Sequence, residues 1–437
     1  MSRKVLAAGA LMLAGGSAHG QEQKKQPPPE FTSGYQLPST TTPNPRPDLF
    51  STIDVLVLVV VMGLVAYYVL ARRSRREVRV LVVFSVLYFG FYKAGCVCSV
   101  GSIQNVALAV AASDYALPFA VGAVFVLPLV FALFAGRVFC AAACPLGAIQ
   151  DLVLQRARRV PGWLDHPLSV LPYLVLGVGV LLASTGSLFL FCKYDPFVGF
   201  YRLSGPAGVL AFGGALLVLG TVVGRPFCRY LCPYGVLLRW CAALSRWRVR
   251  VTPAECIQCH LCADACPFGA IHPPQPERVE IDRRRERAAV SRLLSVLPVA
   301  MALGAWAGWL VGPALARTHP AVRLADRLWQ EERGVVRGTT DETTAFRNLG
   351  QPNAVAYGAG VAVRRQFEVG TALLGAWCAL VLALKGVAVR MRRARKDYEA
   401  DPASCVSCGR CYASCPVDLA QKTGQPVELI LQRGPST

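Results

Sequence analysis

Long apolar segments alternate along this chain with short segments that are rich in arginine. Seven of the apolar segments are long enough for a helix to cross the hydrocarbon layer of a bilayer, which is ~30 Å thick. They span residues 52–71, 79–95, 115–136, 168–191, 207–224, 291–312 and 369–389. The pattern predicts an α-helical integral membrane protein with about seven spans.

The residues before these spans have a different character. Residues 1–20 combine a basic tip, a short apolar stretch and small residues, as a secretory signal peptide does, although an uncleaved anchor has the same features. Residues 21–50 are rich in Pro, Gln, Thr and Ser and nearly lack aliphatic side chains. Such a segment cannot bury enough apolar surface to fold, so we expect a disordered external leader.

The arginine-rich segments orient the spans, because cytoplasmic loops of membrane proteins carry an excess of Lys and Arg. Basic runs lie at residues 71–79, 155–159, 246–250, 283–287 and 390–396. We therefore expect a multi-pass protein of the cytoplasmic (inner) membrane, with its C-terminus inside and a loop at 313–368 outside. Charged residues make up only 16% of the chain, against ~25% in soluble proteins, so we attribute the net charge of +20 to these loops and expect no nucleic acid partner.

Two cysteine runs follow a five-span membrane domain, which we assign to residues 51–250. Both runs have the spacing C-x2-C-x2-C-x3-C-P, which is the ligand run of bacterial [4Fe–4S] ferredoxins. The first contains Cys256, Cys259, Cys262 and Cys266, and the second contains Cys405, Cys408, Cys411 and Cys415. We expect both to face the reducing cytoplasm, where structural disulfides are rare. The sequence thus predicts a small α+β module, similar to a bacterial ferredoxin, with two [4Fe–4S] clusters.

The two runs lie far apart in the sequence. Residues 251–282 form the first ferredoxin-type segment, residues 397–437 form the second with the tail, and residues 283–396 are predicted to form a transmembrane hairpin between them. In the exchange that is usual for two-cluster ferredoxins, the fourth cysteine of each run binds the other cluster. One cluster would then be bound by Cys256, Cys259, Cys262 and Cys415, and the other by Cys405, Cys408, Cys411 and Cys266.

Two further cysteine pairs have the spacing C-x3-C-P, and each directly follows an apolar segment. They are Cys140 with Cys144 and Cys228 with Cys232, preceded by Arg137 and Arg225. A spacing of four places both cysteines of a pair on one face of a helix, and a helix N-terminus stabilises a thiolate. We expect the two pairs at the cytoplasmic edge of the membrane, where they would hold a third metal centre or act as a dithiol relay.

A related phrase, CVCSVGSIQNV, lies at residues 96–106, beside the predicted external end of its span. Like the C-x3-C-P phrases, it has a glycine three residues after the last cysteine. We expect it to be an outward-facing copy of a duplicated helix–turn–helix unit, in which glycine allows close helix approach. Cys96 and Cys98, with Cys192, would form an outer redox or metal site, an external disulfide or plain packing contacts.

The order of these motifs resembles that of the membrane polyferredoxins of the NapH and NosR type, over residues 80–282 and 390–420. The resemblance implies a [4Fe–4S] membrane protein that moves electrons between the quinol pool, or a cytoplasmic donor, and a periplasmic reductase or flavoprotein. NosR-type proteins carry a large external flavin-binding domain before their spans, and residues 21–50 are too short for one, so a flavin would come only with a partner protein. The copper-reducing accessory proteins of oxidase assembly share the cluster phrases but resemble this chain less.

These motifs indicate an electron-transfer subunit in membrane lipid, with a periplasmic redox partner and a quinol or cytoplasmic donor. A stand-alone enzyme is less consistent with the sequence, which has no Ser–His–Asp set, no G-x-G-x-x-G after a strand and no P-loop. The alternative function is a redox sensor or a maturation factor, including copper reduction for oxidase assembly, that uses the same clusters.

Overall fold

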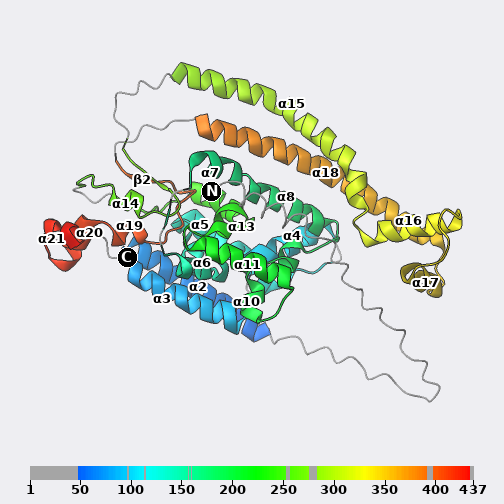
Figure 1. Cartoon of the computed structure of the whole chain (residues 1–437), viewed down its shortest axis with the longest axis horizontal. Helices are drawn as coiled ribbons and strands as arrows, with labels where there is room; N and C mark the ends of the chain where they lie inside the picture. Colours follow the sequence, from blue (N-terminus) through cyan, green and yellow to red (C-terminus); the bar gives the residue numbers. More distant parts are fainter. Residues whose placement is uncertain are drawn as a thin grey trace, which may run out of the picture. The chain divides into compact units, whose positions relative to one another are not determined.

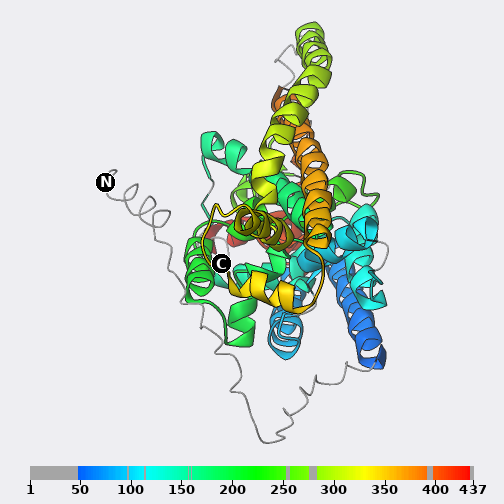
Figure 2. The same cartoon turned by 90° about the vertical axis from the view of Figure 1, so that its right-hand side faces the viewer.

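The computed structural model describes residues 48–95, 98–112, 115–155, 157–158, 160–251, 256–274, 283–390 and 397–433. In these ranges the chain is mostly helical, with one two-stranded sheet (Figures 1 and 2). The predicted signal peptide lies outside the described residues, and so does the predicted leader except for its last three residues, which begin the first described helix.

Helices and two π-helical turns make up the first part of the described chain. In order they are α2 (Asp48–Leu70), α3 (Arg75–Ser85), the π-helical turn η1 (Val86–Tyr92), α4 (Ser99–Ala111), α5 (Phe119–Ala135), the π-helical turn η2 (Phe139–Ala143), α6 (Pro145–Val153), α7 (Gly162–Leu168), α8 (Leu171–Ser184), α9 (Leu190–Lys193), α10 (Val198–Arg202), α11 (Ala207–Gly220), α12 (Pro226–Tyr230) and α13 (Tyr234–Ala243). The second part consists of α14 (Leu261–Asp264), β1 (Ile271–His272), α15 (Arg283–Ala316), α16 (Pro320–Glu332), α17 (Asp341–Asn348), α18 (Asn353–Arg390), β2 (Glu399–Ala400), α19 (Arg410–Ala413), α20 (Pro416–Thr423) and α21 (Val427–Arg433).

Four helical stretches in the described chain are long and apolar enough to cross a membrane. They are Leu49–Leu70, Gly162–Ser184, Val290–Ala316 and Asn353–Val387. All seven predicted spans fall on helical segments, but those at 79–95, 115–136 and 207–224 fall on shorter ones. The chain is therefore a mostly helical membrane protein with four candidate spans.

An internal repeat lies in the membrane domain. One copy consists of α5, η2 and α6, and the other of α11, α12 and α13. In each copy an apolar helix is followed by a Gly-Arg pair, then by a short helical turn, and then by a second helix. Pro145 is the first residue of α6, as expected from the preference of proline for the first helical turn, whereas Pro233 immediately precedes α13.

Helices α15 and α18 lie side by side and form the predicted hairpin (Figures 1 and 2). Small residues bring their backbones into contact: a Cβ atom on Gly304 would lie 2.5 Å from the carbonyl oxygen of Gly375, and one on Gly308 would lie 2.0 Å from that of Thr371. Glycines four residues apart are typical of close helix packing in membranes.

The connection expected as an external loop at 313–368 is mostly helical, which corrects that prediction. Helix α16 is amphipathic, with Val322, Ala325 and Leu328 buried on one face. Helix α17 is held to it by an ion pair between Arg347 and Glu331. Whether this connection lies outside stays a prediction.

The two ferredoxin-type segments lie against each other, because the hairpin brings the chain back to the first segment. Strand β1 follows the first cysteine run, β2 precedes the second, and the strands pair antiparallel with Ile271 opposite Ala400. Val251, Ala263 and Tyr398 are buried in a small core between the segments. The two segments thus lie together, as the predicted hairpin requires.

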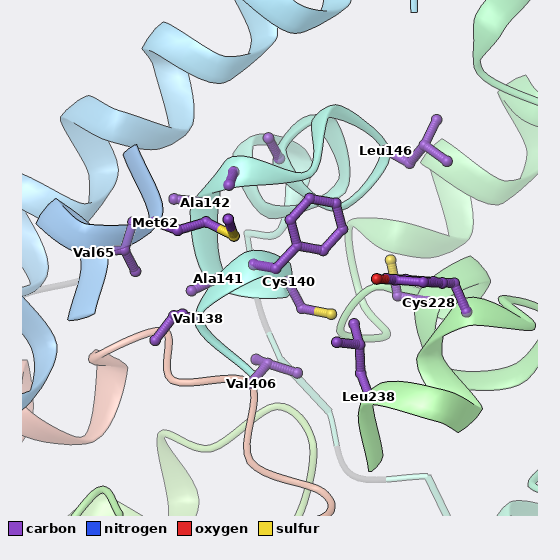
Figure 3. Close-up of a cluster of buried hydrophobic side chains, with 14 of the residues drawn as sticks. Met62, Val65, Val138, Cys140, Ala141, Ala142, Leu146, Cys228, Leu238 and Val406 are labelled. Atoms are coloured by element: carbon purple, nitrogen blue, oxygen red, sulfur yellow. The ribbon is translucent and has the colours of Figure 1, made fainter. Parts of the chain in front are cut away.

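The second cysteine run also packs against the membrane domain. Val406 and Tyr412 belong to the same buried cluster as Met62 of α2 and Val138 and Ala141 of the first repeat copy. Figure 3 shows Val406 beside Val138. The ferredoxin-type module is thus attached to the helices through its second run.

Candidate metal centres

The two ferredoxin-type runs fold into the same loop. Gln258 and His260 of the first run have φ of 52° and 62°, and Ser407 and Gly409 at the equivalent positions of the second run have φ of 53° and 74°. A short helix follows in each case, α14 in the first run and α19 in the second. Left-handed backbone at residues other than glycine costs about 1–3 kcal/mol, and it occurs mostly at functional sites.

Four thiols come together in a first group. The Cys262 thiol interacts electrostatically with those of Cys415, Cys259 and Cys256, and the Cys415 thiol interacts with that of Cys259. Burial, followed by these neighbouring thiols, raises the pKa of Cys262 to about 11. Metal binding at this group must therefore displace protons from the thiols.

The other four cysteines of the two runs form a second group. The Cys405 thiol interacts with those of Cys408 and Cys266, and the Cys411 thiol interacts with all three. Cys411 also interacts with Cys262, so the two groups adjoin each other. In both groups the fourth cysteine of one run lies with three cysteines of the other run, which is the arrangement that the predicted exchange requires.

Protein surrounds the two groups differently. Cys408 and Cys411 pack against the core of the membrane domain, and Arg75 of α3 donates a hydrogen bond of 2.9 Å to the carbonyl oxygen of Cys408. Cys256 and Cys262 pack only against the small core of the ferredoxin-type module, beside the exposed side chain of Ile257. The second group is therefore the one next to the membrane helices.

The two C-x3-C-P pairs also come together. Cys140, Cys144, Cys228 and Cys232 line one small cavity, and their thiols interact electrostatically. Figure 3 shows Cys140 and Cys228 reaching this region from different copies of the repeat. Contrary to the prediction, the cysteines of a pair do not share one helix face: Cys140 lies in η2 and Cys144 precedes α6. The reason is the proline after each second cysteine, because it lacks the N–H that would continue the preceding turn.

Cys98, which we expected on the outer side, lines this same cavity. It interacts electrostatically with Cys192, and a Cβ atom on Gly101 would lie 3.1 Å from the Cys192 sulfur. We expected Cys98 to lie apart from the C-x3-C-P cysteines, but it lies beside them. The reason is that the first residues of α4 are buried in the membrane domain. Cys96 lies outside the described residues.

One local geometry accounts for the repeated phrase. In all three copies, the last cysteine accepts a hydrogen bond from the backbone N–H of the glycine three residues on. The pairs are Gly101 to Cys98, Gly147 to Cys144 and Gly235 to Cys232. Glycine fits where other residues would crowd, since a Cβ atom on Gly147 would lie 3.2 Å from the carbonyl oxygen of Cys140.

A buried carboxylate connects the second thiol group with the C-x3-C-P cysteines. Asp151 of α6 forms ion pairs with Arg75, Arg225 and Arg410. Burial alone would raise the pKa of Asp151, but Arg225, Arg75 and Arg410 hold it well below the usual range of a carboxyl group. Arg225 in turn donates to the carbonyl oxygen of Cys140. Because Arg75 also contacts Cys408, the contacts are continuous from one cysteine set to the other.

Sequence reasoning missed Asp151 and its partners Arg75 and Arg410. The available signal was an acidic residue in the apolar stretch "PLGAIQDLV", since a buried charge in such a stretch needs a charged partner.

Models of known families match the two repeat copies and the first ferredoxin-type run separately. A family model described as a 4Fe-4S binding domain matches twice, at residues 117–163 and 204–252, which contain the two repeat copies. A second model with the same description matches residues 249–272, around the first ferredoxin-type run. No solved structure matches the chain.

Several curated proteins match parts of the chain. The regulatory protein NosR of Pseudomonas aeruginosa is 31% identical over 226 residues, which are 47% of this chain and 31% of NosR. The protein NirI of Paracoccus denitrificans is 35% identical over 155 residues, 32% of this chain and 23% of NirI. The methylamine utilization ferredoxin-type protein MauN of Methylobacillus flagellatus is 28% identical over 163 residues, 34% of this chain and 53% of MauN. The chain thus spans about half of these relatives or less.

Proposed function

Because this chain is a NosR/NapH-like membrane 4Fe–4S protein, we propose that it relays electrons in the inner membrane. The donor is a quinol or a cytoplasmic reductant, and the acceptor is a periplasmic redox partner. The observation that carries this proposal is the meeting of two distant cysteine runs through the pairing of β1 with β2.

The residues around the thiols fit two [4Fe–4S] clusters. In our proposal, one cluster is bound by Cys256, Cys259, Cys262 and Cys415, and the other by Cys405, Cys408, Cys411 and Cys266. The backbone N–H of Ser407 donates to the Cys405 sulfur at 3.5 Å, a contact of the kind that tunes cluster potentials. In the described chain no three Cys, His, Asp or Glu side chains are grouped tightly enough for a single metal ion, whereas a [4Fe–4S] cube spreads its thiolates around a larger core. When bound, such clusters supply one-electron transfer.

A cavity beside the second thiol group favours quinol over a cytoplasmic reductant as the donor. Its volume is about 1020 Å³, and its walls include Leu70 of α2 and Phe131 of α5. Tyr412, the residue after Cys411, also lines it. The lining also includes Arg73, Arg246, Arg248 and Arg250. Apolar walls with some polar groups are typical of small-molecule sites, and α2 and α5 are apolar helices along which a quinol would enter from the bilayer.

Single ligand substitutions test the two cluster assignments. Cys262→Ala and Cys415→Ala should abolish the same electron paramagnetic resonance signal, although they lie in different runs, and Cys408→Ala and Cys266→Ala should abolish the other. Each should remove about four irons per chain. Cys241→Ala, in α13, is the matched control and should keep both signals. Loss of one common signal from Cys408→Ala and Cys415→Ala would mean that each run binds its own cluster.

A redox-sensing or maturation role is the second candidate, favoured by the NosR relatives, which are named regulatory proteins. Stopped-flow mixing of the anaerobic protein with a quinol analogue distinguishes the two. Cluster reduction within the turnover time of a respiratory chain supports the relay, whereas clusters that stay oxidised support sensing or maturation.

A further inference from the structure

We propose that Cys98 and Cys192 form a redox-active dithiol pair at the predicted outer end of the membrane domain, where they react with an external disulfide compound. This inference goes beyond the proposed relay, because it assigns a two-electron thiol chemistry that needs no cluster. It rests on the position of the two thiols, on the surroundings of Gln104 and on the different access to the two sulfurs.

The two thiols lie against the same turn of α4. Cys98 is the N-cap residue of this helix, and its sulfur accepts from the backbone N–H groups of Val100 and Gly101. A Cβ atom on Gly101 would lie 3.1 Å from the sulfur of Cys192, which belongs to α9, and the two thiols interact electrostatically. No third Cys, His, Asp or Glu of the described residues completes a site for a single metal ion with them. The arrangement is therefore that of a dithiol.

The side chain of Gln104 lies beside Cys192 and has one unused donor. Gln104 is fully buried. Its Oε1 atom accepts from the backbone N–H groups of Phe191 and Cys192, at 3.0 and 3.3 Å. Its Nε2 atom has no hydrogen-bond partner among the described residues. Leaving a buried donor without a partner costs free energy, and a thiolate at Cys192 would be an acceptor close to it.

The C-x3-C-P cysteines have the same arrangement, and there the corresponding contact is made. Gln150 has the same place in its phrase as Gln104, six residues after the last cysteine. It accepts from the backbone N–H of Phe227 at 3.0 Å and donates through Nε2 to the Cys228 sulfur at 3.4 Å. The sequence around Cys228 is F-C-R-Y, and that around Cys192 is F-C-K-Y. By this correspondence, the unused N–H of Gln104 is placed to stabilise a Cys192 thiolate.

The two thiols differ in how accessible they are. Cys192 is exposed, and so are Lys193 and Tyr194 directly after it. Cys98 is partly buried and lines the cavity of the C-x3-C-P cysteines. An accessible thiol near a cation is the usual nucleophile of a dithiol pair, and its less accessible partner resolves the mixed disulfide. The basic loops predict that this end of the domain lies outside the cytoplasm, where disulfides persist.

The reaction is a thiol–disulfide exchange in two steps. The Cys192 thiolate attacks one sulfur of the external disulfide, so that a mixed disulfide forms and one external thiolate leaves. The Cys98 thiolate then attacks the Cys192 sulfur, which forms the bond between the two cysteines and releases the second external thiolate. The pair loses two electrons to the external compound, and its two protons pass to the released thiolates. The new bond ties α4 to α9 at the wall of the cavity.

Peptide mass spectrometry of the full-length protein tests the pairing. The protein is equilibrated anaerobically with mixtures of reduced and oxidised glutathione, and the remaining thiols are alkylated. We expect a peptide linked through Cys98 and Cys192 in oxidising mixtures and its loss in reducing ones, and the control Cys241→Ser should behave in the same way. Absence of this peptide from the most oxidising mixture, or a bond from Cys192 to Cys96, would overturn the proposal. The wild-type protein alone decides these cases if a variant does not fold.

Variants of the pair test the order of the two steps. Cys98→Ser removes the second step, so glutathione should accumulate on Cys192, whereas Cys192→Ser should carry no glutathione on Cys98. The reverse pattern would refute Cys192 as the nucleophile. In intact cells, a membrane-impermeant maleimide should label Cys192 of the Cys98→Ser protein, and labelling only after lysis would refute the outer position. None of these measurements involves the clusters, so their failure would leave the proposed function standing.

The role of Gln104 as a positioning residue has its own readout. Gln104→Glu keeps an acceptor for the two backbone N–H groups and removes only the donor. In the Cys98→Ser background, this change should slow the reaction of Cys192 with iodoacetamide several-fold, because less thiolate is present. The control Gln150→Glu alters the corresponding residue beside Cys228 and should leave the Cys192 rate unchanged. Equal Cys192 rates with Gln and Glu at position 104 would exclude thiolate stabilisation by this side chain.

Discussion

At the residue scale, Asp151 is a single side chain that serves two sites. Through Arg225 it supports the loop of Cys140, and through Arg75 it supports Cys408 of the second run. Three arginines around one carboxylate leave positive charge between the two sets of thiols. Such charge would stabilise thiolates in either set.

Asp151→Asn should destabilise the protein strongly. The substitution keeps the shape of the side chain but leaves Arg75, Arg225 and Arg410 without their counter-charge, and breaking a buried ion pair in this way costs about 3–5 kcal/mol. Unfolding in detergent, followed by loss of the iron–sulfur absorbance, measures the effect. The control is Asp397→Asn at an exposed carboxylate of the ferredoxin-type module, where little change is expected. Equal stability of the two variants would show that the network is not needed.

At this scale the sequence predicts which cysteines belong to one run, because ligand spacing is local. The grouping of Cys262 with Cys415 is expected from the exchange of fourth cysteines between the runs of two-cluster ferredoxins. It also requires the fold to bring the two runs together. The contact of Arg410 with Asp151 was not predictable, since it arises where α19 meets α6 and no local pattern encodes that meeting. The position of Cys98 beside the C-x3-C-P cysteines was not predictable for the same reason, since it depends on how α4 packs against the repeat copies.

At the element scale, the hairpin of α15 and α18 depends on backbone contact. Its glycines at 304, 308 and 312 have the spacing of membrane helix interfaces, and the outward-facing tryptophans Trp306 and Trp309 suit lipid. The apolar pattern predicts both helices, but only the glycine spacing indicates which faces meet.

Gly308→Ala should separate these helices. The added Cβ atom would lie 2.0 Å from the carbonyl oxygen of Thr371, so we expect a loss of about 1–3 kcal/mol, the usual cost of overpacking. Gly63→Ala in α2 adds the same atom where no other atom lies within 4 Å, and it should be neutral or stabilise by up to about 1 kcal/mol. Thermal melting in detergent compares the two. A Gly308→Ala protein as stable as the Gly63→Ala protein would contradict close packing at this crossing.

At the scale of the whole molecule, the distribution of basic residues predicts which way the protein faces. We expect a fluorescent protein fused after residue 433 to mature inside the cell. Alkaline phosphatase inserted at Gly338, between α16 and α17, should be active outside. An active phosphatase at the C-terminus would invert the proposed orientation and would place the ferredoxin-type module outside the cytoplasm.

The pairing of β1 with β2 has a consequence for biogenesis. The first cysteine run emerges from the ribosome long before the second, with the whole hairpin still to be made. With the proposed exchange of ligands, each cluster would lack part of its coordination until translation is nearly complete, and the thiols of the first run would stay without metal until then. Premature termination inside the hairpin would then yield a chain with neither complete cluster, so under this proposal only the full-length chain could be matured.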